Sequence, residues 1–262
     1  MLFAYTKGGE EMADHKPTWR VIQVLELVSR CRQGYTLSQI SHELDIPAST
    51  LTPILHTLRD HKYLAFQPDT QRYHAGVGLF EAGSRYTSGS DAYENVVSLM
   101  REVVEACGET CHLGVLEGGS VLYLAKVDSP NPVRMVSTIG RRIPAYGTAI
   151  GKALLRDTDQ AELEALYPQG LEPLTPHTIT SVDRLLEECR EVRRSGFAYE
   201  REESDRDVCC VAVPVETEGR AVAALSVTVP VFRWNEEKMR LIRRLLADAA
   251  KQASRYIIHL NI

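Results

Sequence analysis

Two short runs of hydrophobic residues at helical spacing stand close together near the start of the chain. Leu37, Ile40 and Leu44 form the first run, and the second follows over residues 51–58. Pro47 lies between the runs and disfavours helix at the residue before it. The pattern therefore predicts two helices joined by a tight turn, each too short to be stable alone.

The residues on either side of these runs complete a larger motif. Thr36, followed three positions later by Gln39, is a capping box that marks where the first helix begins. After the second helix, residues 63–66 and 72–74 flank a turn at Pro68, which predicts a β-hairpin. Helix, turn, helix and hairpin is the order of a winged helix-turn-helix.

The outer face of the second helix carries short polar side chains. If its leucines face inward, the residues that face outward are Ser49, Thr52, Pro53 and His56. Hydroxyl and imidazole groups on such a face can bond phosphates and base edges of DNA. A solvated helix face would carry the same residue types. The complete helix–helix–wing order, with Arg72 at the hairpin, favours DNA binding.

A further helix is predicted over residues 19–29, with Thr18 as its cap. It places Arg20 in the first turn, where the helix dipole disfavours a cation. A phosphate partner and a loose surface charge each account for this placement.

The spacing of hydrophobic residues changes after residue 76. A short helix of small and apolar residues leads into a linker-like stretch, and Asp91 begins a long amphipathic helix to residue 106. From residue 109 the hydrophobic period is two. The expected strands cover residues 110–116, 120–127, 134–137, 197–202, 208–215 and 221–229, and the expected helices cover 148–155, 159–166, 182–194 and 236–256. This order predicts an α+β fold with an antiparallel sheet.

Composition places the chain among ordinary globular proteins. It has 262 residues, 44% hydrophobic and 25% charged, a length that suggests two domains. No apolar run reaches the roughly 18 residues of a membrane span, and the start of the chain lacks the pattern of a signal peptide. We therefore expect no membrane partner and a cytoplasmic location.

The net charge of the chain limits its electrostatic attraction to DNA. The net charge is −5, but residues 17–75 hold six basic against five acidic side chains, a balance of +1. Attraction to phosphate is modest, so affinity is expected to depend on dimerisation and on a few well-placed cations.

The six cysteines contain no CxxC pair and suit reduced thiols in the cytosol. Cys107, Cys111 and His112 could ligate a metal, but they lack the second half of a zinc pattern, so no metal site is expected. An alternative to DNA regulation is an enzyme in which Cys210 or Cys111 is the nucleophile and His112 the base. Against this alternative, the sequence shows neither a group that would orient the base nor an oxyanion hole.

Two features of the second half suit a small-molecule site. Small residues at 147–151 let the backbone approach closely where a helix begins, and free N–H groups there bind carboxylates. From this segment alone, tight packing against the sheet is the slightly favoured explanation. Residues two apart on a strand share a face. A second candidate face is therefore formed by Val208 and Cys210 on one strand and by Ser226 and Thr228 on another strand. These hydroxyls would need partners if buried, from a ligand, the backbone or water.

From about residue 18 to residue 256 the chain resembles the IclR family of bacterial transcription regulators. The resemblance rests on residues 37–40, 46–51, 72–73, 141–144, 148–153, 195–198 and 202–203. It implies a flexible tail (1–16), a winged helix-turn-helix DNA-binding domain (17–76), a linker helix (77–90) and a GAF-like effector-binding domain (91–262). It further implies a sequence-specific regulator, with a repressor favoured, controlled by a small organic acid. The partners would be a double-stranded operator and further copies in a homodimer or homotetramer, with no cofactor.

The motif and the resemblance together give two sets of expected site residues. The DNA-binding set is Arg20, Thr36, Ser49, Thr50, Thr52, His56, Arg72 and Tyr73. The effector-binding set implied by the resemblance is Met135, Ile143, Ala149, Ile150, Glu200, Val208, Cys210, Ser226 and Thr228. Glu200 would accept from hydroxyl or ammonium groups, and Ser226 and Thr228 would orient the ligand.

Three positions depart from the family pattern. Ala48 and Pro53 stand where relatives usually carry a Lys and an Arg, which weakens phosphate anchoring. Pro53 is also expected to bend the recognition helix or to confine regular helix to one side. Asp207 replaces a glycine and adds a charge at the pocket rim, which suits a polyhydroxylated ligand such as a sugar acid.

Overall fold

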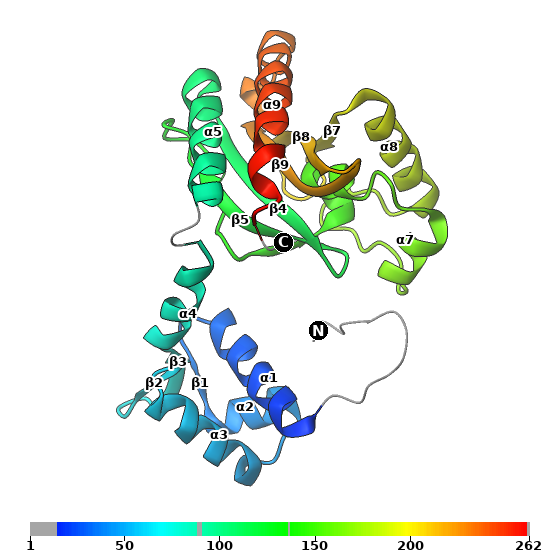
Figure 1. The fold of residues 1–262 in the computed structure, drawn as a ribbon. Helices are drawn as coiled ribbons and strands as arrows, with labels where there is room; N and C mark the ends of the chain where they lie inside the picture. The colour runs from blue at the N-terminus through cyan, green and yellow to red at the C-terminus, as the bar shows by residue number, and fades with distance from the viewer. Residues whose placement is uncertain (1–14, 88–90, 136, 261–262) are drawn as a thin grey trace. The chain divides into compact units, whose positions relative to one another are not determined.

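The computed structural model describes residues 15–87, 91–135 and 137–260, which fall into two compact units, one within Thr6–Ser90 and the other within Asp91–Ile262 (Figure 1). Residues 1–14 of the expected tail (1–16) and the end of the expected linker lie outside this range, and Lys16 is in a helix. No helix of the described residues is long and apolar enough to span a membrane.

The N-terminal unit is a winged helix-turn-helix. Its elements are α1 (Lys16–Arg30), β1 (Tyr35–Thr36), α2 (Leu37–Leu44), α3 (Ala48–Asp60), β2 (Leu64–Gln67), β3 (Arg72–Ala75) and α4 (Val77–Thr87). The capping box is present, because Gln39 N–H donates to Thr36 Oγ1 at 3.3 Å and Thr36 N–H donates to Gln39 Oε1 at 3.0 Å. The three strands form an antiparallel sheet in the order β1-β3-β2, so the predicted hairpin gains a third strand.

The first helix differs from the sequence prediction. It begins at Lys16 with Pro17 in its first turn, where the missing N–H costs no helical hydrogen bond. Thr18 is inside the helix and lies 2.9 Å from His15 Nδ1 through its hydroxyl, so it does not cap the helix.

Two alternative effects are expected of Pro53, a bend in the helix or the confinement of regular helix to one side, and the confinement is wrong. Helix α3 runs without interruption from Ala48 to Asp60. Leu51 and Leu55 are completely buried against the unit's core on either side of the proline. Packing of this apolar face holds the helix together although the proline cannot donate to the carbonyl four residues earlier.

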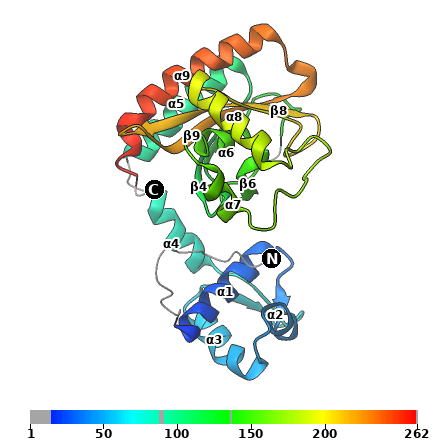
Figure 2. The same ribbon diagram turned by 90° about the vertical axis from the view of Figure 1, so that its right-hand side faces the viewer.

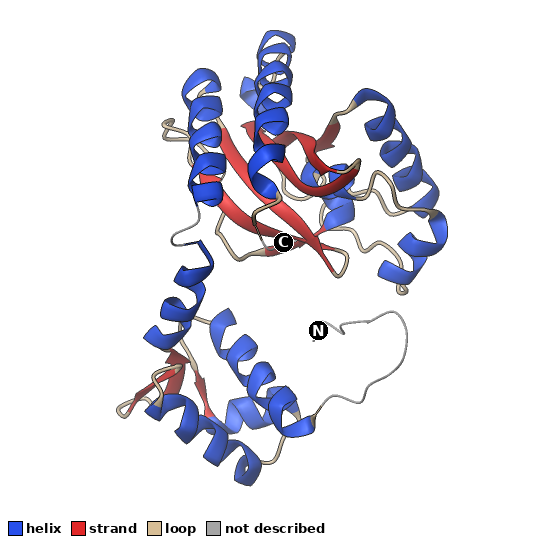
Figure 3. Cartoon of the chain, viewed as in Figure 1, coloured by secondary structure: helices blue, strands red, loops and turns tan. Residues whose placement is uncertain are grey.

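The C-terminal unit is a six-stranded antiparallel sheet with helices on both faces (Figures 2 and 3). Its elements are α5 (Asp91–Cys107), β4 (Thr110–Glu117), β5 (Ser120–Val127), β6 (Arg142–Pro144), η1 (Ala145–Gly147), α6 (Ala149–Leu154), α7 (Gln160–Leu166), α8 (Val182–Ser195), β7 (Ala198–Arg201), β8 (Val208–Thr217), β9 (Arg220–Pro230), η2 (Val231–Arg233) and α9 (Glu236–Ile257). The strand order is β6-β5-β4-β9-β8-β7. The α+β class and the antiparallel sheet are confirmed.

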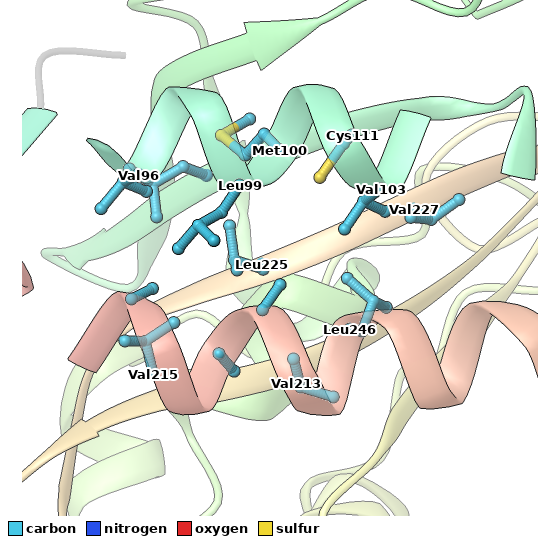
Figure 4. Packing of buried hydrophobic residues seen from close by; sticks show 14 of the residues in the cluster. Val96, Leu99, Met100, Val103, Cys111, Val213, Val215, Leu225, Val227 and Leu246 are labelled. Carbon is cyan, nitrogen blue, oxygen red and sulfur yellow. The ribbon is translucent and has the colours of Figure 1, made fainter. Parts of the chain in front are cut away.

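Each face of this sheet has its own core. Helices α5 and α9 cover one face, where Met100, Cys111, Leu225 and Leu246 are among the buried residues (Figure 4). Helices α6, α7 and α8 lie over the other face. Neighbouring residues on a strand therefore enter different cores.

The strand predicted at residues 134–137 is wrong. None of its described residues is in a strand, and β6 at Arg142–Pro144 pairs with β5 instead. Pro130 and Pro132 precede the predicted strand in the same connection, and proline cannot donate to a sheet ladder. The described residues between β5 and β6 instead form a loop.

Candidate functional site

Helix α3 presents the polar face expected of a recognition helix. Ser49 and His56 are exposed, and Thr50 and Thr52 are half-buried. Thr52 Oγ1 donates to the carbonyl of Ala48 at 2.8 Å, so its hydroxyl proton is already used. Ser49 and His56 are thus the better placed of these side chains to bond a nucleic acid.

Arg72 connects the wing to the helix-turn-helix. Its Nη1 donates to the carbonyl of Gly34 at 2.7 Å and to Gln39 Oε1 at 3.3 Å. Gly34 has φ of +67°, and a Cβ there would lie 2.5 Å from the Tyr73 carbonyl, so only glycine fits this close approach. Arg72 is half-buried and can serve both this link and a nearby phosphate.

The other expected DNA-contact residues differ in exposure. Tyr73 is only 7% exposed and packs on Phe66, with ring centroids 4.8 Å apart, so its place favours a packing role. Thr36 is half-buried and caps α2. Arg20 is half-buried on α1. Contact with DNA stays a prediction for all of these residues.

In the C-terminal unit, the sheet face toward α6 holds a buried polar cluster. Strand register sets Glu200 opposite Cys210, and Cys210 opposite Thr228. Cys210 Sγ lies 3.3 Å from Thr228 Oγ1. Glu200, Ser226 and Thr228 are all buried. Four members of the expected effector set therefore meet on adjacent strands β7, β8 and β9.

One carboxylate oxygen of Glu200 accepts several hydrogen bonds, and the other accepts none within the described structure. Its Oε1 accepts from the N–H groups of Glu203 at 2.7 Å and Ser204 at 3.1 Å. Its Oε2 is buried without a hydrogen-bond partner among the described residues. Burial raises the pKa of the Glu200 carboxyl above its ordinary value. A protonated Glu200 would donate to a ligand, whereas the ionised form would only accept.

The remaining expected effector residues lie on β6, α6, β8 and the loop after β5. Ile143, Ala149, Ile150 and Val208 are buried, and Met135 is half-buried in the loop between β5 and β6. At the start of α6 the Thr148 hydroxyl already accepts from Gly151 N–H at 2.9 Å. A Cβ on Gly151 would lie 1.9 Å from the Ala145 carbonyl, so this glycine serves tight packing.

Asp207 stands in the turn between β7 and β8. It is exposed and has φ of +61°, a conformation that glycine adopts freely and aspartate tolerates better than most residues. Its N–H donates to Glu202 Oε1 at 3.0 Å.

Three polar side chains near this cluster, His112, Ser137 and Tyr123, were not among the expected site residues. His112 Nε2 lies 2.6 Å from Ser137 Oγ and its Nδ1 lies 3.5 Å from Thr228 Oγ1. The ring lies beside Tyr123, with centroids 4.9 Å apart. Alternation along β4 shows which face His112 occupies, but only the strand order shows that this face meets Thr228.

The thiol and metal chemistry considered for this unit does not fit the geometry. Cys111 enters the core under α5 and α9, whereas its neighbour His112 faces the other side of the sheet. Burial and the nearby Glu200 raise the pKa of the Cys210 thiol well above its ordinary value, which disfavours the nucleophilic thiolate. Within the described residues no group of three His, Cys, Asp or Glu side chains could hold a metal ion.

Two family profiles match this chain and together cover most of it. The IclR helix-turn-helix domain matches residues 19–68, and the bacterial transcriptional regulator IclR C-terminal domain matches residues 84–255. The chain is 34% identical to the HTH-type transcriptional regulator KdgR of Escherichia coli K12, over 90% of each chain. It is 33% identical to the regulator XynR of the same organism, over 90% of this chain and 94% of XynR.

Solved structures show the same fold. An IclR transcriptional regulator from Alicyclobacillus acidocaldarius has a TM-score of 0.83 at 25% identity, covering 92% of this chain and 98% of its own. An IclR homologue from Microbacterium hydrocarbonoxydans, complexed with 4-hydroxybenzoate, has a TM-score of 0.77 at 24% identity, covering 91% and 99%.

Proposed function

This chain belongs to the IclR family of bacterial transcriptional regulators and is a DNA-binding regulator, not an enzyme; we propose that it represses transcription from its operator until a small organic acid binds the C-terminal unit. In this proposal residues 17–76 read DNA, residues 77–90 link the units, and residues 91–262 sense the effector.

The observation that carries the effector site is the buried polar cluster around Glu200, Cys210 and Thr228. Burying polar groups in a sheet core is costly unless they have partners, yet Glu200 Oε2 has none within the described structure. A bound ligand would supply that partner. Apart from Glu200, the polar side chains of the cluster are uncharged hydrogen-bonding groups. They suit the hydroxyl groups of a hydroxylated carboxylate such as a sugar acid.

DNA contact is assigned to the exposed face of α3 and to the wing. Ser49 and His56 are proposed to bond base edges or phosphates in the major groove, with Thr50 and Thr52 beside them. Arg72, Arg20, Thr36 and the hydroxyl of Tyr73 are proposed to fix the unit's position on the backbone. The absence of the family's two cations at Ala48 and Pro53 makes the α3 side chains more important.

A homodimer or homotetramer is proposed as the working form. Val77 and Phe80 on α4 are 63% and 75% exposed, so this helix carries apolar side chains that a second copy could cover. Two copies would also compensate for the weak positive charge of the DNA-binding unit, because they bind two half-sites at once.

A gel-shift experiment with the full-length chain and the DNA upstream of its own gene tests the DNA half of this proposal. We expect a shift that unlabelled specific DNA abolishes and that a shuffled sequence does not. A control with His56 and Ser49 both replaced by Ala should lose the sequence-specific shift. If the unaltered chain gives no specific shift at low salt, the proposed operator lies elsewhere or the assignment fails.

A further inference from the structure

His112 on β4 lies beside the polar cluster, although the sequence offers it only as a catalytic base or a metal ligand and not as an effector-binding residue. It is 1% exposed, and strand register places it opposite Ser226 on β9 and Lys126 on β5. Both of its ring nitrogens face hydroxyl groups, those of Ser137 and Thr228.

The two hydrogen bonds of this imidazole differ greatly in length. The 2.6 Å contact from Nε2 to Ser137 is short and fixes the ring on the loop between β5 and β6. The 3.5 Å contact from Nδ1 to Thr228 is at the limit of a hydrogen bond. Nδ1 is therefore the nitrogen that a better-placed ligand hydroxyl could engage, beside Thr228 and Cys210.

The imidazole is uncharged at neutral pH. Burial and the nearby Lys126 lower the pKa of His112 to about 4, against the weaker opposing effect of Asp128. A neutral imidazole has one donor and one acceptor nitrogen, which matches a hydroxyl group better than a carboxylate. Lys126 is engaged elsewhere, since its Nζ donates to the Ser137 carbonyl and pairs with Asp128.

We propose that His112 is a specificity-determining residue of the effector site, where its imidazole bonds a hydroxyl group of the effector and so selects hydroxylated carboxylates over their unsubstituted analogues. This inference rests on the proposed function of the cluster as the effector site. The same hydroxyl would lie within reach of Thr228, whose own contact with His112 is weak. A site built to bond a hydroxyl rejects the analogue that lacks it, because its polar groups are left unpaired.

The test uses the full-length chain and its His112→Phe variant. Phenylalanine keeps an aromatic ring beside Tyr123 but removes both nitrogens. Binding is measured by titration calorimetry with matched pairs of acids: gluconate and hexanoate, lactate and propionate, and 4-hydroxybenzoate and benzoate. His74→Phe, in the other unit, is the matched control.

We expect the unaltered chain to prefer the hydroxylated member of at least one pair. His112→Phe should raise the Kd of that member about ten-fold and leave the Kd of the unsubstituted member unchanged, as expected for the loss of one hydrogen bond to a buried group. His74→Phe should keep the preference. If His112→Phe does not fold, which circular dichroism reveals, His112→Leu, which also lacks polar atoms, provides the same readout, with a Kd change confined to the hydroxylated acid.

Two results would overturn the inference and leave the proposed function standing. One is an unchanged hydroxyl preference in a folded His112 variant. The other is an unaltered chain that binds the unsubstituted acids at least as tightly in every pair. If no acid in the panel binds the unaltered chain, both this inference and the proposed effector class fail, while operator binding is judged separately by gel shift.

Discussion

The guanidinium of Arg72 donates a 2.7 Å hydrogen bond to the main-chain carbonyl of Gly34, 38 positions earlier in the chain. The bond fastens strand β3 of the wing to the turn before α2. A side chain that bridges the two parts of a winged helix can both hold the wing in place and offer charge to a phosphate.

Arg72→Ala is predicted to reduce DNA affinity by the same factor for operator and unrelated sequences, because the wing contact lacks base readout. It should also destabilise the N-terminal unit by about 1 kcal/mol through the lost charged hydrogen bond. Fluorescence anisotropy on both duplexes and urea unfolding measure the two effects. Arg72→Lys is the control that keeps the charge and should keep most of the affinity. A changed sequence preference would show that the wing reads bases.

His56→Ala on the exposed face of α3 is predicted to weaken operator binding more than binding to unrelated DNA. The loss for the operator should be about 1–3 kcal/mol if the imidazole contacts a base edge. Competition binding with operator variants measures it. His61→Ala, at the end of the same helix, is the matched control and should leave the operator preference intact. Equal losses on both DNAs would instead assign His56 to a phosphate.

The local features of the N-terminal unit could be predicted from sequence because they depend on neighbouring residues. The capping box joins Thr36 and Gln39, which are three positions apart, and the apolar spacing of α3 identifies its buried face. The polar cluster could be predicted only in part. His112 and Ser137 are 25 positions apart, and their contact depends on strand order and on the path of a loop, which periodicity does not encode.

Lys152→Met is predicted to destabilise the C-terminal unit strongly. The Lys152 ammonium is buried and donates to Glu203 Oε1 at 2.7 Å and to the Tyr199 carbonyl at 2.9 Å. Its removal leaves the buried Glu203 carboxylate unpaired, a loss of about 3 kcal/mol or more. Urea unfolding measures it, with Lys251→Met as the control, because Lys251 is exposed on α9.

The double variant Lys152→Met, Glu203→Gln should recover part of the stability that the single variant loses, because no uncompensated charge stays buried. If the double variant is less stable than Lys152→Met alone, the pair does not act through its charges.

The buried His112 is predicted to make the protein acid-sensitive between pH about 6.5 and 4. Its pKa is about 4 in the folded chain and near the ordinary value of about 6.5 when unfolded, so protons bind the unfolded state first. The contribution of neutral His112 to the free energy of unfolding is therefore present above pH about 6.5 and is lost as the pH falls toward about 4. The flanking groups are Lys126, Asp128 and Tyr123.

The comparison of the unaltered chain with His112→Phe isolates this effect. The difference in unfolding free energy between the two should change by about 3 kcal/mol over this pH range, in favour of the variant at low pH. Urea unfolding at pH about 7.5, 6, 5 and 4 measures it. Parallel stability profiles for the two proteins would mean that His112 does not titrate as a buried neutral group.

An acid bound in the C-terminal unit is proposed to control DNA binding by the N-terminal unit. It is tested by anisotropy titration of the full-length chain on its labelled operator, with and without the hydroxylated acid that binds most tightly in calorimetry. We predict that the acid weakens operator binding about ten-fold, within the usual range of allosteric coupling, and leaves the Thr228→Val variant unaffected. Operator affinity that stays the same at saturating acid would contradict the account.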